Sequence, residues 1–182
     1  MTTPQPARLR PSSPTRYEEI SRHLLQQAEE ELDNGDVLQA SEKIWLAVAH
    51  GLKAIAQHRG WNHRYHNHLR AIESFLSLEW NRPDWETTFG SIENMHTNAY
   101  EHQRFPGNIR PYLLLATIYS RELADTRHSA PPPGVQLSGE QQATQAINLR
   151  TLTRPLSEQA AFGTQFTPEE ETELPPVNPT QP

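Results

Sequence analysis

The chain has 182 residues, and its apolar fraction of 35% is well below that of an ordinary globular domain. It contains no cysteine, which excludes disulfides, thiolate metal ligands and a cysteine nucleophile. Its net charge of −6 argues against a broad basic surface that grips a nucleic-acid backbone, although a local basic site remains open. Because the chain has neither an apolar run of membrane-spanning length nor a secretory signal pattern, we expect a cytoplasmic protein that does not enter the membrane.

Apolar residues at helical spacing predict five helices, and no segment alternates as a strand would. The first helix is expected over residues 15–34, with Thr15 and Glu18 at the spacing of a capping box. The second, over residues 37–59, is apolar around a wide arc, so we expect it at the centre of the fold. The other three are expected over residues 65–79, 84–102 and 109–127.

Short loops between these helices imply antiparallel neighbours, so the sequence predicts an all-α, antiparallel five-helix bundle over residues 15–128. Residues 1–14 are expected to be a flexible arm. Residues 129–182 hold nine of the sixteen prolines, and we expect a disordered tail there, with at most a weak helix over residues 138–152. Apolar islands in this tail would let it dock on a protein partner.

Two stretches of the sequence resemble a known family. The first lies in the second predicted helix and comprises Gly35–Asp36, Ala40–Trp45, Ala47–His50 and Leu52–Ala56. The second is His96–Glu101 in the fourth predicted helix, where Ala99 stands in place of a phenylalanine. Over about residues 17–125 the chain is therefore similar to the PaREP1-type proteins, which are small all-α proteins that look related to the HEPN superfamily.

The resemblance implies a HEPN-like helical bundle and a homodimer. HEPN-like proteins include RNA-cutting toxins, antitoxin partners and nucleotide binders, so it also implies an association with nucleotides or RNA. We therefore predict a non-enzymatic binding and regulatory module that carries no cofactor. Two alternatives are a toxin-like, metal-independent ribonuclease and a protein-interaction scaffold that docks its partner through the tail.

Ribonuclease members of the superfamily share an arginine that is followed, after four to six residues, by a histidine near the fourth helix. Three pairs fit this spacing, and none lies on the fourth helix: Arg16 with His23, Arg59 with His66, and Arg121 with His128. A chain this rich in arginine and histidine would contain as many by chance, so we assign catalysis to no residue. Arg59 and His66 bracket one loop and serve as the ribonuclease alternative, since histidine can transfer protons and arginine can stabilise a phosphoryl group.

Histidines crowd the region between the second and third helices, and neutral imidazoles can bind zinc. The four are His58, His63, His66 and His68. They straddle a helix start and share no regular spacing on one element, so we interpret them as part of a polar loop and predict no metal site. Glu93 and His96 have the spacing found in di-iron bundles, but the motif occurs once where such sites need two copies. His96 is instead expected to be a hydrogen-bonded core histidine.

Candidate ligand contacts come from the second and fourth helices. Lys43 and Lys53 are the only lysines in the chain, and both lie in the family-like stretch, where each could contact a phosphate or belong to a solvated helix face. Glu42 is expected to reach His96 or Tyr100. The full predicted ligand-binding set is Glu42, Lys43, Lys53, His96, Asn98, Tyr100 and Glu101.

Overall fold

The computed structural model describes residues 13–100 and 108–156, apart from the side chains of residues 98–100. The described residues form six α-helices and no strand. The helices are α1 (Pro14–Asp33), α2 (Val37–Arg59), α3 (His66–Glu79), α4 (Pro83–Tyr100), α5 (Arg110–His128) and α6 (Gly139–Thr153). The all-α class is confirmed, and the first five helices lie within two residues of their predicted bounds.

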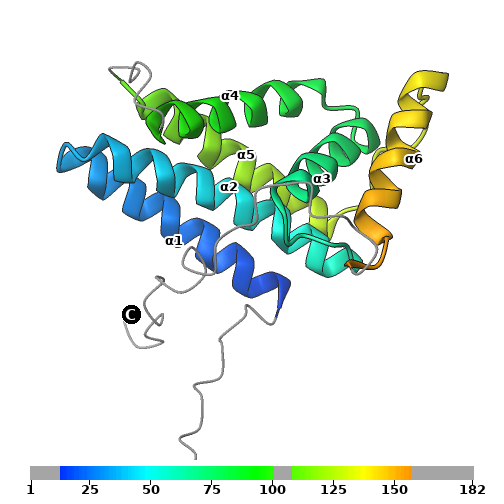
Figure 1. Ribbon diagram of the computed structural model, residues 1–182, viewed down its shortest axis with the longest axis horizontal. Helices are drawn as coiled ribbons and strands as arrows, with labels where there is room; N and C mark the ends of the chain where they lie inside the picture. Colours follow the sequence, from blue (N-terminus) through cyan, green and yellow to red (C-terminus); the bar gives the residue numbers. More distant parts are fainter. Residues whose placement is uncertain (1–12, 101–107, 157–182) are drawn as a thin grey trace, which may run out of the picture.

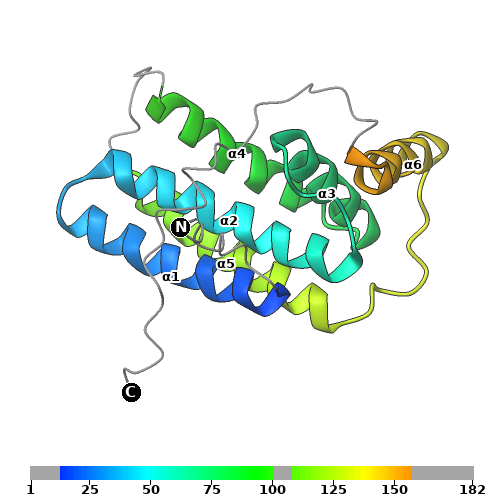
Figure 2. The same ribbon diagram turned by 60° about the horizontal axis from the view of Figure 1, so that its bottom comes forward.

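The bundle is arranged around α2, which contacts α1, α3, α4 and α5. Figure 1 shows α1, α2, α4 and α5 along the long axis of the molecule, with α3 at one end and α6 outside α3. The turned view in Figure 2 also places α6 beside α3. The consecutive pairs α1–α2 and α4–α5 are antiparallel, whereas α2 and α5, which are in contact, run in the same direction (Figures 1 and 2).

The core lies around α2 because apolar residues cover most of that helix. Its larger aliphatic residues Ile44, Val48, Leu52 and Ile55 are fully buried, and each contributes roughly 1.5–3 kcal/mol on burial. Alanines fill the remaining positions and let neighbouring helices approach closely. The central position predicted for the second helix is therefore confirmed.

The helix ends follow local chemistry. Ser13 caps α1, since its Oγ accepts a hydrogen bond from the backbone N–H of Arg16 at 3.2 Å, so the cap predicted at Thr15 is wrong by two residues. Asp36 caps α2 through a 3.0 Å hydrogen bond from the N–H of Gln39. Gly60 ends α2 with a φ of 69°, a left-handed conformation that glycine adopts without steric cost.

The helix α6 lies in the segment that the sequence predicts to be a disordered tail. It begins with a capping box formed by Ser138 and Gln141, and it packs against α3. The predicted number of five helices is therefore wrong, and so is the prediction of disorder for Gly139–Thr153. The physical reason is local, since a cap and one well-placed leucine, Leu152, order a segment whose average composition is polar. Residues 1–12 and 157–182 lie outside the described residues.

Candidate functional site

One buried tryptophan of α2 is in contact with imidazole rings from α3 and α4. Trp45 of α2 is 2% exposed. The imidazoles of His66 at the start of α3 and His96 on α4 both stack on its indole, with ring centroids 5.1 and 5.4 Å away. Phe89 of α4 packs at 5.7 Å in a tilted orientation. Because the indole is buried, it positions the two imidazoles and offers little surface of its own to a ligand.

His66 and Arg70, one turn apart on α3, share a carboxylate of α4. His66 Nε2 donates to Glu93 Oε1, and Arg70 Nε donates to the same oxygen at 2.8 Å. The Arg70 side chain is 63% exposed and that of Glu93 is 13% exposed, so the guanidinium faces solvent while the carboxylate is largely covered. We call Trp45, His66, Arg70, Glu93 and His96 the His66 cluster.

The His66 cluster combines a charged carboxylate with a neutral imidazole. Burial alone would raise the pKa of Glu93, but the hydrogen bonds from His66 and Arg70 outweigh burial and lower the pKa. Burial, together with a smaller effect of the nearby charge of His66, lowers the pKa of His96 to about 4. At neutral pH Glu93 is therefore ionised, and His96 carries no positive charge.

A buried acid lies on α3 near the cluster. Glu73 is almost completely buried, and its Oε1 has no hydrogen-bond partner. Burial raises its pKa to about 8, with further contributions from Glu86 and Glu93 of α4. Tyr119 of α5 is also buried with an unpartnered hydroxyl, and burial followed by the charge of Glu73 raises its pKa. Glu73 is thus mostly a neutral carboxylic acid at pH 7.

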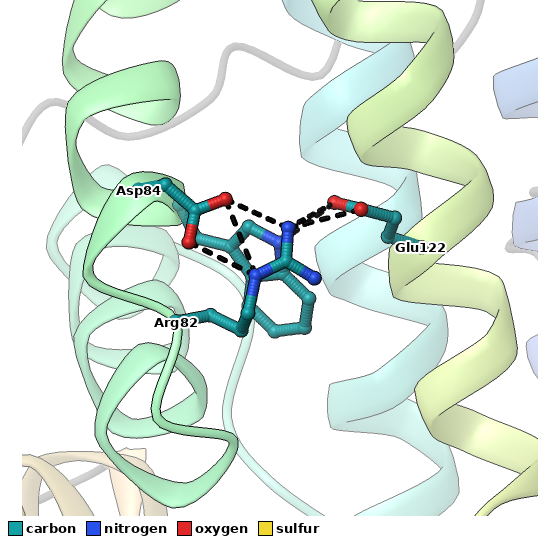
Figure 3. Close-up of polar contacts among 4 residues, drawn as sticks. Arg82, Asp84 and Glu122 are labelled. Atoms are coloured by element: carbon teal, nitrogen blue, oxygen red, sulfur yellow. Dashed lines mark hydrogen bonds and ion pairs between the residues drawn. The ribbon is translucent and has the colours of Figure 1, made fainter.

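A second charged cluster connects the start of α4 to α5. Figure 3 shows Arg82 between Asp84 and Glu122, with its Nη2 donating to Asp84 Oδ2 at 2.7 Å and to Glu122 Oε1 at 2.9 Å. The guanidinium lies over the Trp85 ring at 4.8 Å, and Trp85 Nε1 donates to Glu122 Oε2 at 2.8 Å. Hydrogen bonding to Asp84 raises the pKa of Arg82 and lowers that of Asp84. We call these four residues the Arg82 clamp.

The structure does not gather the predicted lysine contacts at the His66 cluster. Lys43 pairs with Glu31 of α1 at 3.9 Å, and it points away from Trp45 because residues two apart on a helix differ by about 200°. Lys53 lies about 15 Å further along α2. It is buried near His50, whose pKa falls to about 3 because of burial and then because of the charge of Lys53.

The remaining predicted ligand contacts lie on or beyond the described helices. Glu42 is half-buried on α2, and its predicted contact with His96 or Tyr100 stays a prediction. The side chains of Asn98 and Tyr100, and the whole of Glu101, lie outside the described residues. Of the predicted ligand contacts, the His66 cluster therefore includes His96.

The two residues of the predicted ribonuclease pair, Arg59 and His66, contact different carboxylates. Arg59 donates through both Nη atoms to the carboxylate of Glu79, at 3.0 and 2.7 Å, while His66 pairs with Glu93. The arginine that shares a partner with His66 is Arg70. Sequence reasoning missed Arg70 and Glu93, although the four-residue spacing of His66 and Arg70 places both on one helix face.

The other histidines of this region support the local fold. His63 makes a 3.2 Å hydrogen bond to the hydroxyl of Tyr17, which ties the loop before α3 to α1. His68 Nδ1 accepts hydrogen bonds from the backbone N–H groups of Arg64 and Tyr65, and so caps α3. Within residues 13–100 and 108–156, no group of three or more histidine, aspartate or glutamate side chains is placed to hold a metal ion.

The fold and the site define a small all-α protein with a polar cluster where α2, α3 and α4 meet. None of its described helices is both long and apolar enough to cross a membrane. The chain belongs to the archaeal PaREP1/PaREP8 family, whose model matches residues 16–111, just over half of its length. This match confirms the PaREP1-like resemblance and includes the whole His66 cluster. No curated protein and no solved structure matches the chain.

Proposed function

We propose that this protein is a non-enzymatic binding and regulatory module of HEPN-like type, which binds a nucleotide, free or within RNA, at the His66 cluster. The observation that carries the proposal is the exposed guanidinium of Arg70 beside the half-exposed imidazole of His66. An arginine fork matches the geometry of phosphate oxygens, and an imidazole can stack on a base or donate a hydrogen bond to it. Such a local site is compatible with a net charge of −6.

The chemistry around Trp45 also supports a binding role. Placing Glu93 and two imidazoles beside a buried indole removes polar groups from water, which costs free energy that aliphatic side chains would not cost. A bundle that served only as a scaffold would gain more from filling the same space with leucine or isoleucine. The polar composition of the cluster therefore favours a function at this place.

The protonation states favour binding over cleavage. Metal-independent RNA cleavage needs one group to accept the 2′-hydroxyl proton and a second group to protonate the leaving oxygen. His66 supplies one imidazole, and Glu73, whose pKa burial raises to about 8, is buried outside the cluster. With a pKa of about 4, His96 has no proton to donate at neutral pH, and Glu93 already accepts from His66 and Arg70. The cluster thus offers donors for phosphate and lacks a second proton-transfer group of suitable pKa.

A titration of nucleotides tests the proposal. We expect AMP, ATP, GTP or a short single-stranded RNA to raise the melting temperature of the full chain. We expect Arg70→Ala to weaken the binding by about tenfold or more, since a charge-assisted hydrogen bond contributes roughly 1.5–3 kcal/mol. Arg22→Ala removes an exposed arginine of α1 and is the matched control. Equal losses in both variants contradict the site, and no shift with any probe contradicts the function.

A toxin-like ribonuclease is the second candidate, and the hydrogen bond between His66 and Glu93 favours it. A carboxylate partner orients an imidazole and stabilises its protonated form, as acid–base catalysis requires. An assay of RNA cleavage in the presence of a chelator distinguishes the candidates. Cleavage that disappears in His66→Ala supports the ribonuclease, whereas cleavage that survives this substitution assigns the activity elsewhere.

We also infer a homodimer, which is supported by three exposed apolar side chains on α5: Leu114, Leu115 and Ile118. Sedimentation velocity of the full chain tests it, and a monomer at micromolar concentration contradicts it. Docking of a protein partner through residues 157–182 is a separate proposal, to be tested by partner capture with and without that segment. The cytoplasmic location predicted from the sequence can be checked by cell fractionation.

A further inference from the structure

The helix α6 lies against one helix of the bundle and buries one of its own residues there. Among the described helices, α3 is the one that α6 contacts, and Leu152 is the one buried residue of α6. Asn148 adds a hydrogen bond from its Nδ2 to Ser74 Oγ of α3 at 2.9 Å. The segment that leads to α6 includes Pro131–Gly134, which is exposed. One leucine and a few hydrogen bonds therefore oppose the entropy of ordering a 15-residue helix.

The orientation of α6 is also unusual for a helix of a stable core. Its more apolar side chains face away from α3, since Ile147 is 58% exposed and Leu149 is 40% exposed. The face toward α3 carries the polar residues Gln145 and Asn148 in addition to Leu152. Little apolar surface is thus buried between α6 and α3, and the docked state has a small advantage over the undocked state.

The end of α6 holds the loop that precedes His66. The backbone N–H of Asn62 donates to the carbonyl of Leu152 at 2.8 Å, and Asn62 Nδ2 donates to the carbonyl of Arg154 at 2.7 Å. Asn62 is four residues before His66, where α3 begins. The same contact that docks α6 therefore fixes the start of the loop that positions His66.

We propose that α6 is a detachable latch, which leaves α3 as a unit while the bundle stays folded. When it is docked, it holds Asn62 at the start of the loop that leads to His66, and so helps to keep His66 in contact with Trp45 and Glu93. When it is released, the loop gains freedom and the His66 cluster loosens. The effect on ligand affinity rests on the proposed function of the cluster, whereas the latch itself does not.

Hydrogen exchange on the full chain tests the latch, with two leucines of one helix as a matched pair. Leu152→Asp places a charge in the contact with α3, and Leu149→Asp makes the same change on the exposed side. In Leu152→Asp we expect amide protection to fall by about tenfold or more at Asn62 and over residues 139–154. Amides of α1, α2 and α5 are expected to keep wild-type protection, and the NMR signals of the His66 ring are expected to shift. Leu149→Asp is expected to change none of these.

Three results overturn the proposal. Loss of protection throughout the bundle shows that α6 is part of the cooperative core; if Leu152→Asp does not fold, the milder Leu152→Ala is measured in its place and decided by the same criterion. Unchanged protection at Asn62 or unchanged His66 signals remove the link between α6 and the loop. Equal effects of the two aspartate variants show that the charge and not the contact matters.

Titration with ATP and with a short single-stranded RNA separates the latch from the proposed function. A severalfold change of affinity in Leu152→Asp, absent in Leu149→Asp, supports control of the His66 cluster by α6. Equal affinity in Leu152→Asp and the wild type overturns that control. If the wild type binds neither probe, the proposed function fails, while the exchange measurement still decides the latch.

Discussion

The two arginine–carboxylate clusters of α4 differ in how completely their charges are matched. In the Arg82 clamp, one guanidinium meets two carboxylates and lies over an indole (Figure 3). In the His66 cluster, Glu93 alone is shared by Arg70 and His66, and the guanidinium is mostly exposed. The first arrangement is closed by the side chains of the protein, as a structural contact should be. The second leaves a cationic group facing solvent, as a binding site requires.

Glu73 is electrostatically coupled to Glu93 of the His66 cluster, and it gives the largest expected effect. Glu93 contributes to its raised pKa, and the charges of Glu73 and Glu122 both raise the pKa of Tyr119. In the folded state the pKa of Glu73 is about 8, against an ordinary value of 4.5, so the folded state keeps a proton that the unfolded state releases. The stability that this proton provides is complete below pH 4.5 and is lost as the pH rises toward 8.

Urea unfolding between pH 6.5 and 8 isolates this effect. Below pH 6.5 the lowered pKa values of His50 and His96 act in the opposite direction, because protons that bind their unfolded forms destabilise the fold. Because the wild type and Glu73→Gln both contain these histidines, the difference between their free energies of unfolding isolates Glu73. We expect this difference to shrink by about 1.4 kcal/mol per pH unit near pH 6.5 and by about half as much per unit at pH 8, where half of the folded molecules have lost the proton. Glu73→Gln should remove this slope, and the exposed control Glu29→Gln should keep it. An equal slope in both variants means that Glu73 does not hold the proton that the folded state keeps.

The Arg82 clamp gives the next largest effect. Glu122→Ala removes the acceptor of both Arg82 and Trp85, and we expect the free energy of unfolding to fall by about 1–2 kcal/mol. Nucleotide affinity should not change, because the clamp is closed. Asp125→Ala removes an exposed carboxylate from the same helix and serves as the control in the urea titration. If the two variants are equally stable, the clamp contributes no more than a solvated charge, and the contrast between the clusters is wrong.

The helices were predictable from the sequence because their signals are local. Asp36 and Gly60 bound α2 through interactions with nearby residues, and the apolar periodicity of α2 specifies its central place. The sequence allowed a weak helix over residues 138–152 but placed it in a disordered tail, because average composition says little about a capping box and a single anchor, Leu152. Whether Leu152 can be buried depends on the surface of α3, and that surface is formed only when the bundle has packed.

The candidate site was predictable in part. His66 was the histidine of the ribonuclease alternative and His96 was a predicted ligand contact, and both lie in the cluster. Their partners were not predictable, because Glu93 is 27 residues from His66 and its position depends on how α3 and α4 pack. The same holds for Arg59, whose predicted partner was His66 and whose observed partner is Glu79. Spacing along one helix can identify a shared face, but it cannot identify the residue on the neighbouring helix.

Glu93→Gln has the smallest expected effect on stability and decides between the two functions of the cluster. Glutamine keeps the shape of the side chain and an oxygen that can accept from His66 and Arg70, so only the charge of the acceptor is lost and we expect the free energy of unfolding to fall by about 1 kcal/mol. In a phosphate-binding site the carboxylate competes with the ligand for Arg70, so its neutralisation should tighten binding by roughly two- to fivefold. In a ribonuclease the same change removes the group that orients and stabilises the His66 imidazolium, so cleavage should fall sharply.

The control for this prediction is Glu86→Gln, an exposed position of the same helix, which should alter neither binding nor cleavage. Calorimetric titration with the nucleotide that stabilises the wild type measures the affinity. A loss in Glu93→Gln as large as that in Arg70→Ala means that the ligand contacts the carboxylate itself. The site would then recognise a hydrogen-bond donor, such as a base amino group, and Arg70 would act by holding Glu93 in place.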